Sequence, residues 1–431
     1  MTVSVSSAVV TALSVSQVTL ALLIPTLNPS GSALAFDSNS LVDAVPDAED
    51  SWPVKQARND ESGPDGPEAL ASIYTKYKKP VPEELDAIIT RRRKRDSFQA
   101  TIQDTFNKAF TIRTNIGLSE KKFDLIVDTA SAGLWVLSEE AANTKLQESY
   151  IPENSLSSEK MNGYLWEIAQ FNGKTASGDV YTDFVSFDTS KGPVSFENQA
   201  IQVANSASGF DRMAGVSGVM GMAFGSRNPI KPEPQPTFFD NVMDSLDEKV
   251  FTIDMKQLAA GSVEFGAIDS QKYYGDIGYA DVLNENGYWN FTIGGLFNGA
   301  TPAADSVEYV VADTSSSFVM LPMPYVTMYY SQIVGAGYSD RYGGALFPCD
   351  SEVYDFTFEV GGVEMAIPAE DIKFSKLRGN PDYCFGALQS SDKLGFNLIG
   401  STAFKSSFVV FDPVNFKIGW AKKPLRSEDS E

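Results

Sequence analysis

The chain of 431 residues contains no histidine and only two cysteines. The absence of histidine excludes Ser-His-Asp and Cys-His nucleophile systems, histidine general bases and histidine-ligated zinc. Two cysteines are too few for a cysteine-rich metal centre. We therefore expect no metal and no other cofactor. If the protein is an enzyme that works by acid–base chemistry, carboxylates must carry the proton transfers.

Positive charge is scarce in this chain. It has 34 Lys and Arg residues against 56 Asp and Glu residues, which gives a formal net charge of −22. Such an excess repels nucleic acid and anionic membranes, so we expect neither as a partner. The self-repulsion fades as carboxylates become protonated, which suits an acidic milieu. Solubility alone accounts for the charge equally well.

A long apolar run occurs only at the start of the chain. Residues 3–27 are apolar, small or uncharged, and Ala33-Leu34-Ala35 fits a signal-peptide cleavage site. Pro25 and Pro29 disfavour a membrane-spanning helix. We therefore interpret residues 1–35 as a signal peptide. The protein is then expected to be secreted, to an extracellular or vacuolar compartment, and to have no membrane partner after signal removal.

A secretory route assigns roles to two further features. Cys349 and Cys384 are expected to form one disulfide in an oxidising compartment, the alternative being two unrelated buried thiols. The sequence Asn290-Phe291-Thr292 is an N-glycosylation sequon, and we expect a glycan on Asn290 although the run around it resembles a strand.

The segment after the signal peptide differs in composition from the rest of the chain. Residues 36–70 are rich in Asp, Glu, Pro, Gly and Ser, as in a poorly ordered spacer. Five consecutive basic residues occupy positions 91–95, a pattern found in nucleic-acid or membrane patches and at processing sites. In a secretory chain we favour a processing site. We therefore predict a prosegment over residues 36–95 and a mature chain that begins near Asp96.

The remainder of the chain is predicted to be mainly β. Short runs of Val, Ile, Phe, Tyr and Thr alternate with turn residues at intervals of about 8–12 residues. Residues 123–127, 178–185 and 407–411 are typical strands. Helices are expected only over residues 237–246 and 325–333, both of which follow prolines.

A weak internal repeat divides the mature chain. An apolar run leads into Asp128-Thr129-Ala130-Ser131, and Val219-Met220-Gly221 follows about 90 residues later. A second apolar run leads into Asp313-Thr314-Ser315-Ser316, and Leu398-Ile399-Gly400 follows about 85 residues later. We therefore predict two related lobes, over residues 96–283 and 284–431.

The repeated aspartates predict a catalytic pair, Asp128 and Asp313. Two carboxylates held about 3 Å apart cannot both ionise, so one keeps a proton and serves as acid while the other serves as base. A water between them can then attack a peptide carbonyl without a covalent enzyme intermediate. A single Asp-Thr-x-Ser motif would more simply begin a turn or cap a helix. The second copy favours the catalytic interpretation.

The neighbouring hydroxyl residues are predicted to support the pair. Thr129 and Thr314 are expected to hydrogen-bond across the two loops and fix their mutual geometry. Ser131 and Ser316 are expected to donate to the outer carboxylate oxygens, which favours ionisation.

Two segments resemble the active-site segments of the pepsin-like aspartic proteases: FDLIVDTASAGLWVL at 123–137 and VADTSSSFVMLP at 311–322. The similarity extends from Pro67 to Leu425 and is nearest to the secreted filamentous-fungal penicillopepsin and aspergillopepsin type. It implies a bilobal pepsin-like fold with two related β lobes around a central cleft. It also implies a monomeric aspartic endopeptidase that cleaves polypeptide substrates between bulky apolar residues at acidic pH.

The resemblance also assigns residues outside the catalytic pair. It implies a zymogen in which Lys76 and Tyr77 cover the two aspartates until the prosegment leaves. Gln170 stands where the family has the flap tyrosine, and Asn172 stands where the family has an aspartate that accepts a basic P1 side chain. The positions of Phe210 and Val219 match apolar walls of the substrate-binding subsites.

An alternative function remains open at this point. The third position of the family's Asp-Thr-Gly triplet is Ala130 in one copy and Ser315 in the other, and the flap tyrosine is replaced. A catalytically weak or inactive pepsin-like protein that binds peptides in its cleft would have such changes.

Overall fold

The computed structural model describes most of the mature chain. The described residues are 98–104, 110–117, 121–142, 147–169, 175–189, 192–208, 215–256, 259–298, 301–302, 307–339, 344–377 and 380–425. The predicted signal peptide and prosegment, with Lys76 and Tyr77, lie outside these residues. So do Gln170, Asn172 and Phe210.

The described chain is built mainly from β-strands, as its alternation of β-branched and turn residues predicts. The strands are β1 Phe98–Asp104, β2 Phe110–Ile116, β3 Lys122–Asp128, β4 Leu134–Leu137, β5 Glu159–Ala169, β6 Thr175–Thr189, β7 Gly192–Ser208, β8 Gly218–Gly221, β9 Ile230–Lys231, β10 Phe251–Asp254, β11 Gly261–Phe265, β12 Tyr274–Asp281, β13 Asn290–Asn298, β14 Thr301–Pro302, β15 Glu308–Ala312, β16 Val319–Leu321, β17 Gly337–Ser339, β18 Gly344–Pro348, β19 Phe356–Val360, β20 Val363–Ile367, β21 Lys373–Leu377, β22 Asn380–Gly386, β23 Leu388–Ser390, β24 Asn397–Ile399, β25 Ser407–Asp412 and β26 Lys417–Lys422. The predicted strands at 123–127, 178–185 and 407–411 lie within β3, β6 and β25.

The helices are short. They are α3 Phe238–Val242, α4 Met323–Tyr330, α5 Ala369–Ile372 and α6 Ser401–Ser406, with 3-10 turns η2 Pro152–Asn154, η3 Gly225–Arg227 and η4 Met243–Ser245. Among the described residues, no helix has both the length and the apolar character needed to cross a bilayer.

Both predicted helices exist, with different bounds. The expected helix over 237–246 is α-helical only to Val242 and continues as a 3-10 turn. It begins where Thr237 and Asp240 form a capping box, which satisfies two amide donors that the first turn leaves free. The helix expected over 325–333 begins at Met323 and ends at Tyr330. Pro324 is accommodated in its first turn, where an amide donor is not needed.

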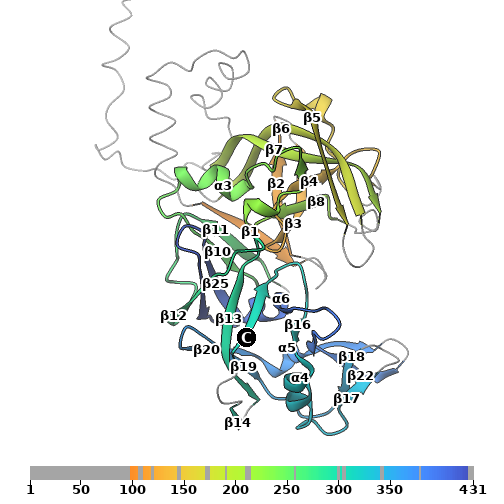
Figure 1. Ribbon diagram of the computed structural model, residues 1–431, viewed down its shortest axis with the longest axis vertical. Helices are drawn as coiled ribbons and strands as arrows, with labels where there is room; N and C mark the ends of the chain where they lie inside the picture. The colour runs from red at the N-terminus through yellow and green to blue at the C-terminus, as the bar shows by residue number, and fades with distance from the viewer. Residues whose placement is uncertain are drawn as a thin grey trace, which may run out of the picture. The chain divides into compact units, whose positions relative to one another are not determined.

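The first half of the chain forms most of a 14-stranded sheet. The strand order is β12-β26-β25-β10-β11-β1-β2-β3-β8-β4-β7-β6-β5-β9. β3 is parallel to β8, and β8 is antiparallel to β4, so that the three strands lie side by side (Figure 1). The last four residues of β3 are all buried, which explains its continuous apolar run, because a strand covered on both faces has no polar side.

The second half repeats this arrangement in an 8-stranded sheet of order β20-β19-β13-β15-β24-β16-β23, with β14 paired to β13. β15 is parallel to β24, and β24 is antiparallel to β16. A separate 4-stranded sheet has the order β17-β18-β22-β21. β3 and β8 in the first half thus correspond to β15 and β24 in the second, as the repeated sequence pattern predicts.

Aromatic side chains join the two halves in one core. Trp289, which is 1% exposed, donates from Nε1 to the Met222 carbonyl at 2.8 Å. Its ring lies 4.5 Å from that of Phe224 and 4.9 Å from that of Phe411. The described residues belong to one compact unit. The segment after β8 is therefore held against the start of the second half.

The predicted disulfide between Cys349 and Cys384 is present. The antiparallel pairing of β18 with β22 brings the two cysteines together. In this pairing Phe347 faces Cys384 and Pro348 faces Tyr383, and Cys349 comes directly after β18. The two cysteines are 35 positions apart.

Replacing both cysteines by alanine is expected to lower the free energy of unfolding by about 3–4 kcal/mol, because a cross-link of this span restricts the unfolded chain. Urea unfolding of the wild type and the double variant, each with and without reductant, measures the loss. Reductant should shift the wild-type midpoint and leave the variant unchanged. Equal midpoints for the two oxidised proteins would contradict the expectation.

Candidate active site

Asp128 ends β3 and is almost fully buried. Its side chain is 7% exposed. The amide of Ala130 donates to Asp128 Oδ1 at 2.9 Å, so the chain turns back onto the carboxyl directly after the strand. The Ser131 hydroxyl is buried and has no hydrogen bond of standard geometry among the described residues.

Asp313 follows β15 and is surrounded by donors. Its side chain is 9% exposed. Oδ1 accepts from the amides of Ser315 and Ser316 at 3.0 and 3.1 Å, and from the Ser315 hydroxyl at 2.9 Å. The Ser316 hydroxyl donates to Oδ2 at 2.5 Å. Asp313 thus accepts four hydrogen bonds, more than Asp128 does.

Thr129 and Thr314 bridge the two loops by reciprocal hydrogen bonds. The amide of Thr129 donates to Thr314 Oγ1 at 3.1 Å, and the amide of Thr314 donates to Thr129 Oγ1 at the same distance. Each hydroxyl also donates to a carbonyl before the opposite aspartate, that of Ala312 at 2.8 Å and that of Val127 at 2.7 Å. Both threonines are buried. These four bonds hold the two aspartate-bearing loops together, which is the geometry expected for them.

A glycine on the neighbouring strand makes room for each loop. A Cβ on Gly221 would lie 2.6 Å from the Ser131 carbonyl oxygen, and a Cβ on Gly400 would lie 2.6 Å from the Ser316 carbonyl oxygen. Both distances are too short for any other residue. The apolar-apolar-Gly element that recurs after each aspartate therefore exists because the loop backbone passes directly over it.

The pKa of Asp128 is raised from its ordinary value of 3.8 to about 6. Burial is the largest cause, and the negative charge of Asp313 is the next. Polar groups of Ser131, Ala130 and Ser315 act in the opposite direction by favouring the charged form. The charge of Asp313 can raise the pKa of Asp128 only if the two carboxyls lie near each other.

A cavity of about 110 Å³ opens beside Asp128, and we call it the Asp128 cavity. Val219, predicted as a subsite wall, lies in its lining next to Trp135. The Trp135 ring is 5.8 Å from that of Trp166 on β5. The complete lining is Asp128, Ala130, Ser131, Ala132, Gly133, Trp135, Ile168, Gln202, Val219, Arg227 and Pro229.

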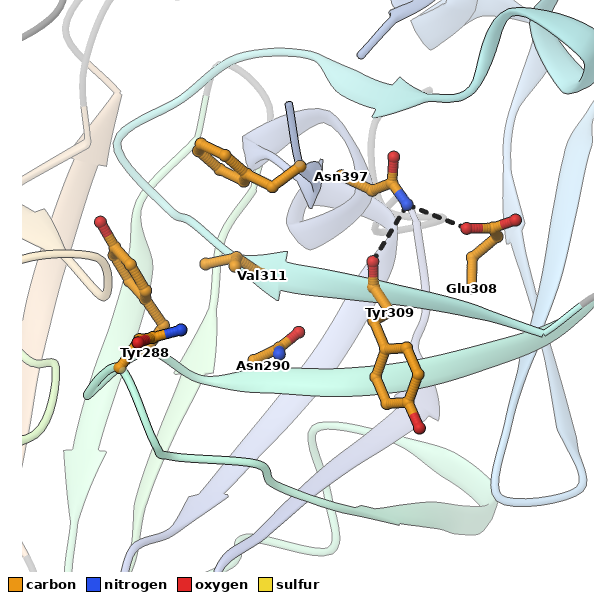
Figure 2. Close-up of a pocket in the computed structure, with 8 residues that line it drawn as sticks. Tyr288, Asn290, Glu308, Tyr309, Val311 and Asn397 are labelled. Atoms are coloured by element: carbon orange, nitrogen blue, oxygen red, sulfur yellow. Dashed lines mark hydrogen bonds between the residues drawn. The ribbon is translucent and has the colours of Figure 1, made fainter. Parts of the chain in front are cut away.

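A second cavity, of about 400 Å³, lies at β13, β15 and β24 (Figure 2), and we call it the Asn290 cavity. Val311, two positions before Asp313, projects into it. Asn397 Nδ2 donates to Glu308 Oε2 at 3.0 Å and to the Tyr309 carbonyl at 3.1 Å across its upper edge. Asn290, the sequon residue, is the first residue of β13, as its strand-like surroundings suggest, and lines the same cavity.

Sequence reasoning missed two polar residues of the Asp128 cavity. Gln202 on β7 is completely buried, and Arg227 ends the turn η3. A signal for Arg227 was available, because it is the only charged residue in positions 215–230, directly after the apolar-Gly element. The described residues contain no group of three or more His, Cys, Asp or Glu side chains placed to hold a metal ion.

Comparison with known proteins agrees with this geometry. The family model described as eukaryotic aspartyl protease matches residues 109–423. Endothiapepsin of Cryphonectria parasitica is 34% identical over 382 residues, which cover 86% of this chain and 90% of the relative. Podosporapepsin of Podospora anserina is 35% identical over 392 residues, which cover 87% and 91%.

A solved structure is similar in fold. The crystal structure of an aspartic proteinase from Irpex lacteus superposes with a TM-score of 0.64 at 18% identity, and the match covers 78% of this chain and 100% of that one. The two mainly β halves, each with its parallel strand pair behind an aspartate, are thus those of the pepsin-like fold. Together with the matches in sequence, these observations show that the chain belongs to the eukaryotic aspartyl protease family.

Proposed function

We propose that this chain is an aspartic endopeptidase that hydrolyses polypeptides with a water activated between Asp128 and Asp313. One observation carries the proposal: the reciprocal hydrogen bonds of Thr129 and Thr314 hold two buried carboxyls close enough for one charge to raise the pKa of the other acid. Carboxyls in this state supply an acid and a base at the same pH, as peptide hydrolysis requires.

The difference in donors assigns the roles. Asp313 accepts four hydrogen bonds, which favour its charged form, and the raised pKa of Asp128 favours a proton there. Asp313 then takes a proton from water as the water oxygen attacks the carbonyl carbon, and Asp128 gives its proton to the carbonyl oxygen. The resulting gem-diol returns one hydroxyl proton to Asp128. Asp313 protonates the amide nitrogen as the C–N bond breaks, which releases a carboxylic acid and an amine.

The lining of the Asp128 cavity supports a preference for bulky apolar residues. Val219 and Trp135 are both at most 5% exposed and border the cavity beside the carboxyl. Apolar walls of this kind favour apolar side chains next to the scissile bond, while a few polar groups set orientation. Gln170, Asn172 and Phe210 are proposed to complete these subsites.

The remaining parts of the chain fit a secreted zymogen. We propose that residues 1–35 are a signal peptide and residues 36–95 a prosegment in which Lys76 and Tyr77 cover the dyad before acid activation. The mature enzyme, acting as a monomer, would then comprise lobes at 96–283 and 284–431. A glycan on Asn290 would stand at the Asn290 cavity, which this residue lines.

Proteolysis tests the proposal directly. After incubation in acid to release the prosegment, the wild type is expected to cleave a denatured protein substrate at about pH 4, where one carboxyl of the pair holds a proton. Asp128→Asn and Asp313→Asn should each lower the rate at least about 100-fold, since each removes a proton-transfer group. Sequencing of the new N-terminus shows whether processing occurred near Asp96. Equal rates for the wild type and Asp128→Asn would refute the proposal.

The raised pKa of Asp128 also makes stability depend on pH. Between its unfolded value of 3.8 and about 6, the folded chain binds the proton more tightly than the unfolded chain does. This contribution to stability is complete below about pH 4 and is lost as the pH rises through about 6.

Asp128→Asn, which removes the buried charge at little change in volume, is therefore expected to stabilise the protein at neutral pH by up to about 3 kcal/mol. The gain should vanish near pH 4. Urea unfolding at both pH values measures it, with Asp244→Asn at an exposed carboxylate as the matched control. A gain that is the same at both pH values would show that burial of the Asp128 charge is not its cause.

Ser315 adds a hydroxyl donor where the family has glycine. Replacing Ser315 by glycine removes the bond from Oγ to Asp313 Oδ1 and leaves the amide donor in place. We expect the acidic limb of the kcat/KM profile to move to higher pH, because the catalytic pair then lacks a hydroxyl donor that favours its charged form. Ser315→Ala should move it equally, since both variants lack the hydroxyl. If the kcat/KM profiles of both variants coincide with that of the wild type, the Ser315 hydroxyl has no electrostatic effect on the catalytic pair.

A further inference from the structure

Arg227 connects the Asp128 cavity with the Asn290 cavity. It ends the turn η3 and lines the Asp128 cavity. Its guanidinium lies 3.6 Å from the centre of the Tyr288 ring, and Tyr288 lines the Asn290 cavity. A peptide side chain that enters the Asp128 cavity therefore comes close to this residue.

The hydrogen bonds of Arg227 leave one edge of its guanidinium unused. Nη1 donates to the Asn286 carbonyl at 2.9 Å, and this is its only hydrogen bond among the described residues. Nε is buried and has no partner there. Nor do the described residues place a carboxylate in an ion pair with Arg227. Nε and Nη2 together form a two-donor edge that matches the two oxygens of a carboxylate.

A second polar side chain in the same cavity also lacks partners. Gln202 is 0% exposed, and neither its Oε1 nor its Nε2 has a hydrogen-bond partner among the described residues. Its amide faces Gly133 across the cavity wall, since a Cβ on Gly133 would lie 2.0 Å from Oε1. Buried polar atoms are nearly always paired in folded proteins. Two residues with unpaired buried polar atoms thus line one cavity, where a polar ligand could pair with them.

We propose that Arg227 forms a subsite for an acidic residue of the peptide, an Asp or Glu within a few positions of the scissile bond. The proposal rests on the proteolytic function proposed above and defines its substrate class more narrowly. The carboxylate would bind the Nε and Nη2 edge in a bidentate manner, with the Gln202 amide as a further donor inside the cavity. The apolar wall of Val219 and Trp135 would accept a different residue of the same peptide.

A purely structural role explains only part of this arrangement. The bond to Asn286 and the contact with Tyr288 tie the turn η3 to the segment before β13. These contacts use Nη1 and the face of the guanidinium. They do not use the buried Nε. Because a buried donor without a partner is costly, the edge formed by Nε and Nη2 is the part of Arg227 that a ligand would stabilise. In a chain with a net charge of −22, most surfaces repel an acidic peptide. Binding of an acidic side chain by Arg227 would thus oppose the repulsion that the net negative charge of the chain exerts on an acidic peptide.

The test compares matched peptides. A set of substrates carries Glu or its neutral isostere Gln at each position in turn around one scissile bond, and kcat/KM is measured at about pH 5, where Glu is ionised. At one position the wild type is expected to prefer Glu roughly 10- to 100-fold, the range of a charge-assisted hydrogen bond. Arg227→Met should bring that ratio to about 1, because the variant lacks the cation that binds the Glu carboxylate. A general loss of activity in the variant would lower the rates of both peptides and leave the ratio unaffected. Arg113→Met, at an exposed arginine paired with Asp124, should leave the ratio as in the wild type.

Several outcomes would overturn the proposal. They are the absence of a Glu preference at every position in the wild type, a ratio that survives in Arg227→Met, and a ratio that also falls in Arg113→Met. If the Met variant does not fold, Arg227→Lys replaces it in the test. This variant keeps the positive charge but not the two parallel N–H donors of the guanidinium, so it should lose most of the preference for Glu.

A failure of the proteolytic function would be seen separately. It would leave all peptides uncut by the wild type as well as by Asp128→Asn. In that event the same Glu and Gln pair, made as reduced-amide peptides, is compared by calorimetric binding to the wild type and to Arg227→Met. Tighter binding of the Glu peptide that depends on Arg227 would support the subsite, and equal binding would refute it.

Discussion

The reciprocal hydrogen bonds between Thr129 and Thr314 are the contact on which the rest of the site depends. They join residues 185 positions apart, and each hydroxyl both accepts from the opposite amide and donates into the opposite strand. Because the amide and the hydroxyl of each threonine are both used, neither loop can shift without breaking bonds in the other. These four bonds therefore fix the position of one carboxyl-bearing loop relative to the other.

Holding the carboxyls together in this way has a cost. Both are buried, and the charge of Asp313 opposes ionisation of Asp128, so the folded chain favours a proton on Asp128. The cost is met elsewhere, by extended apolar strands packed behind each loop and by the aromatic contacts around Trp289.

The two halves share a framework but differ in their donors. β3 with β8 and β15 with β24 present the aspartates in the same way, each above a glycine. The serine hydroxyls break the symmetry, because those of the second half reach Asp313 with standard geometry while that of Ser131 does not reach Asp128 in this way. A repeated fold thus supplies two chemically distinct carboxyls, and the cation of Arg227 stands on the side of the more weakly supported one.

The sequence by itself determined the mainly β fold and the two aspartate-bearing halves. These follow from local patterns, namely buried strands that read as continuous apolar runs and a motif that occurs twice. Only the tertiary structure decided which hydroxyl reaches which carboxyl oxygen, where α3 and α4 end, and that Arg227 lines the Asp128 cavity. Such contacts depend on strand register and on the packing of residues far apart in the chain, to about an ångström, and no local pattern encodes distances of that kind.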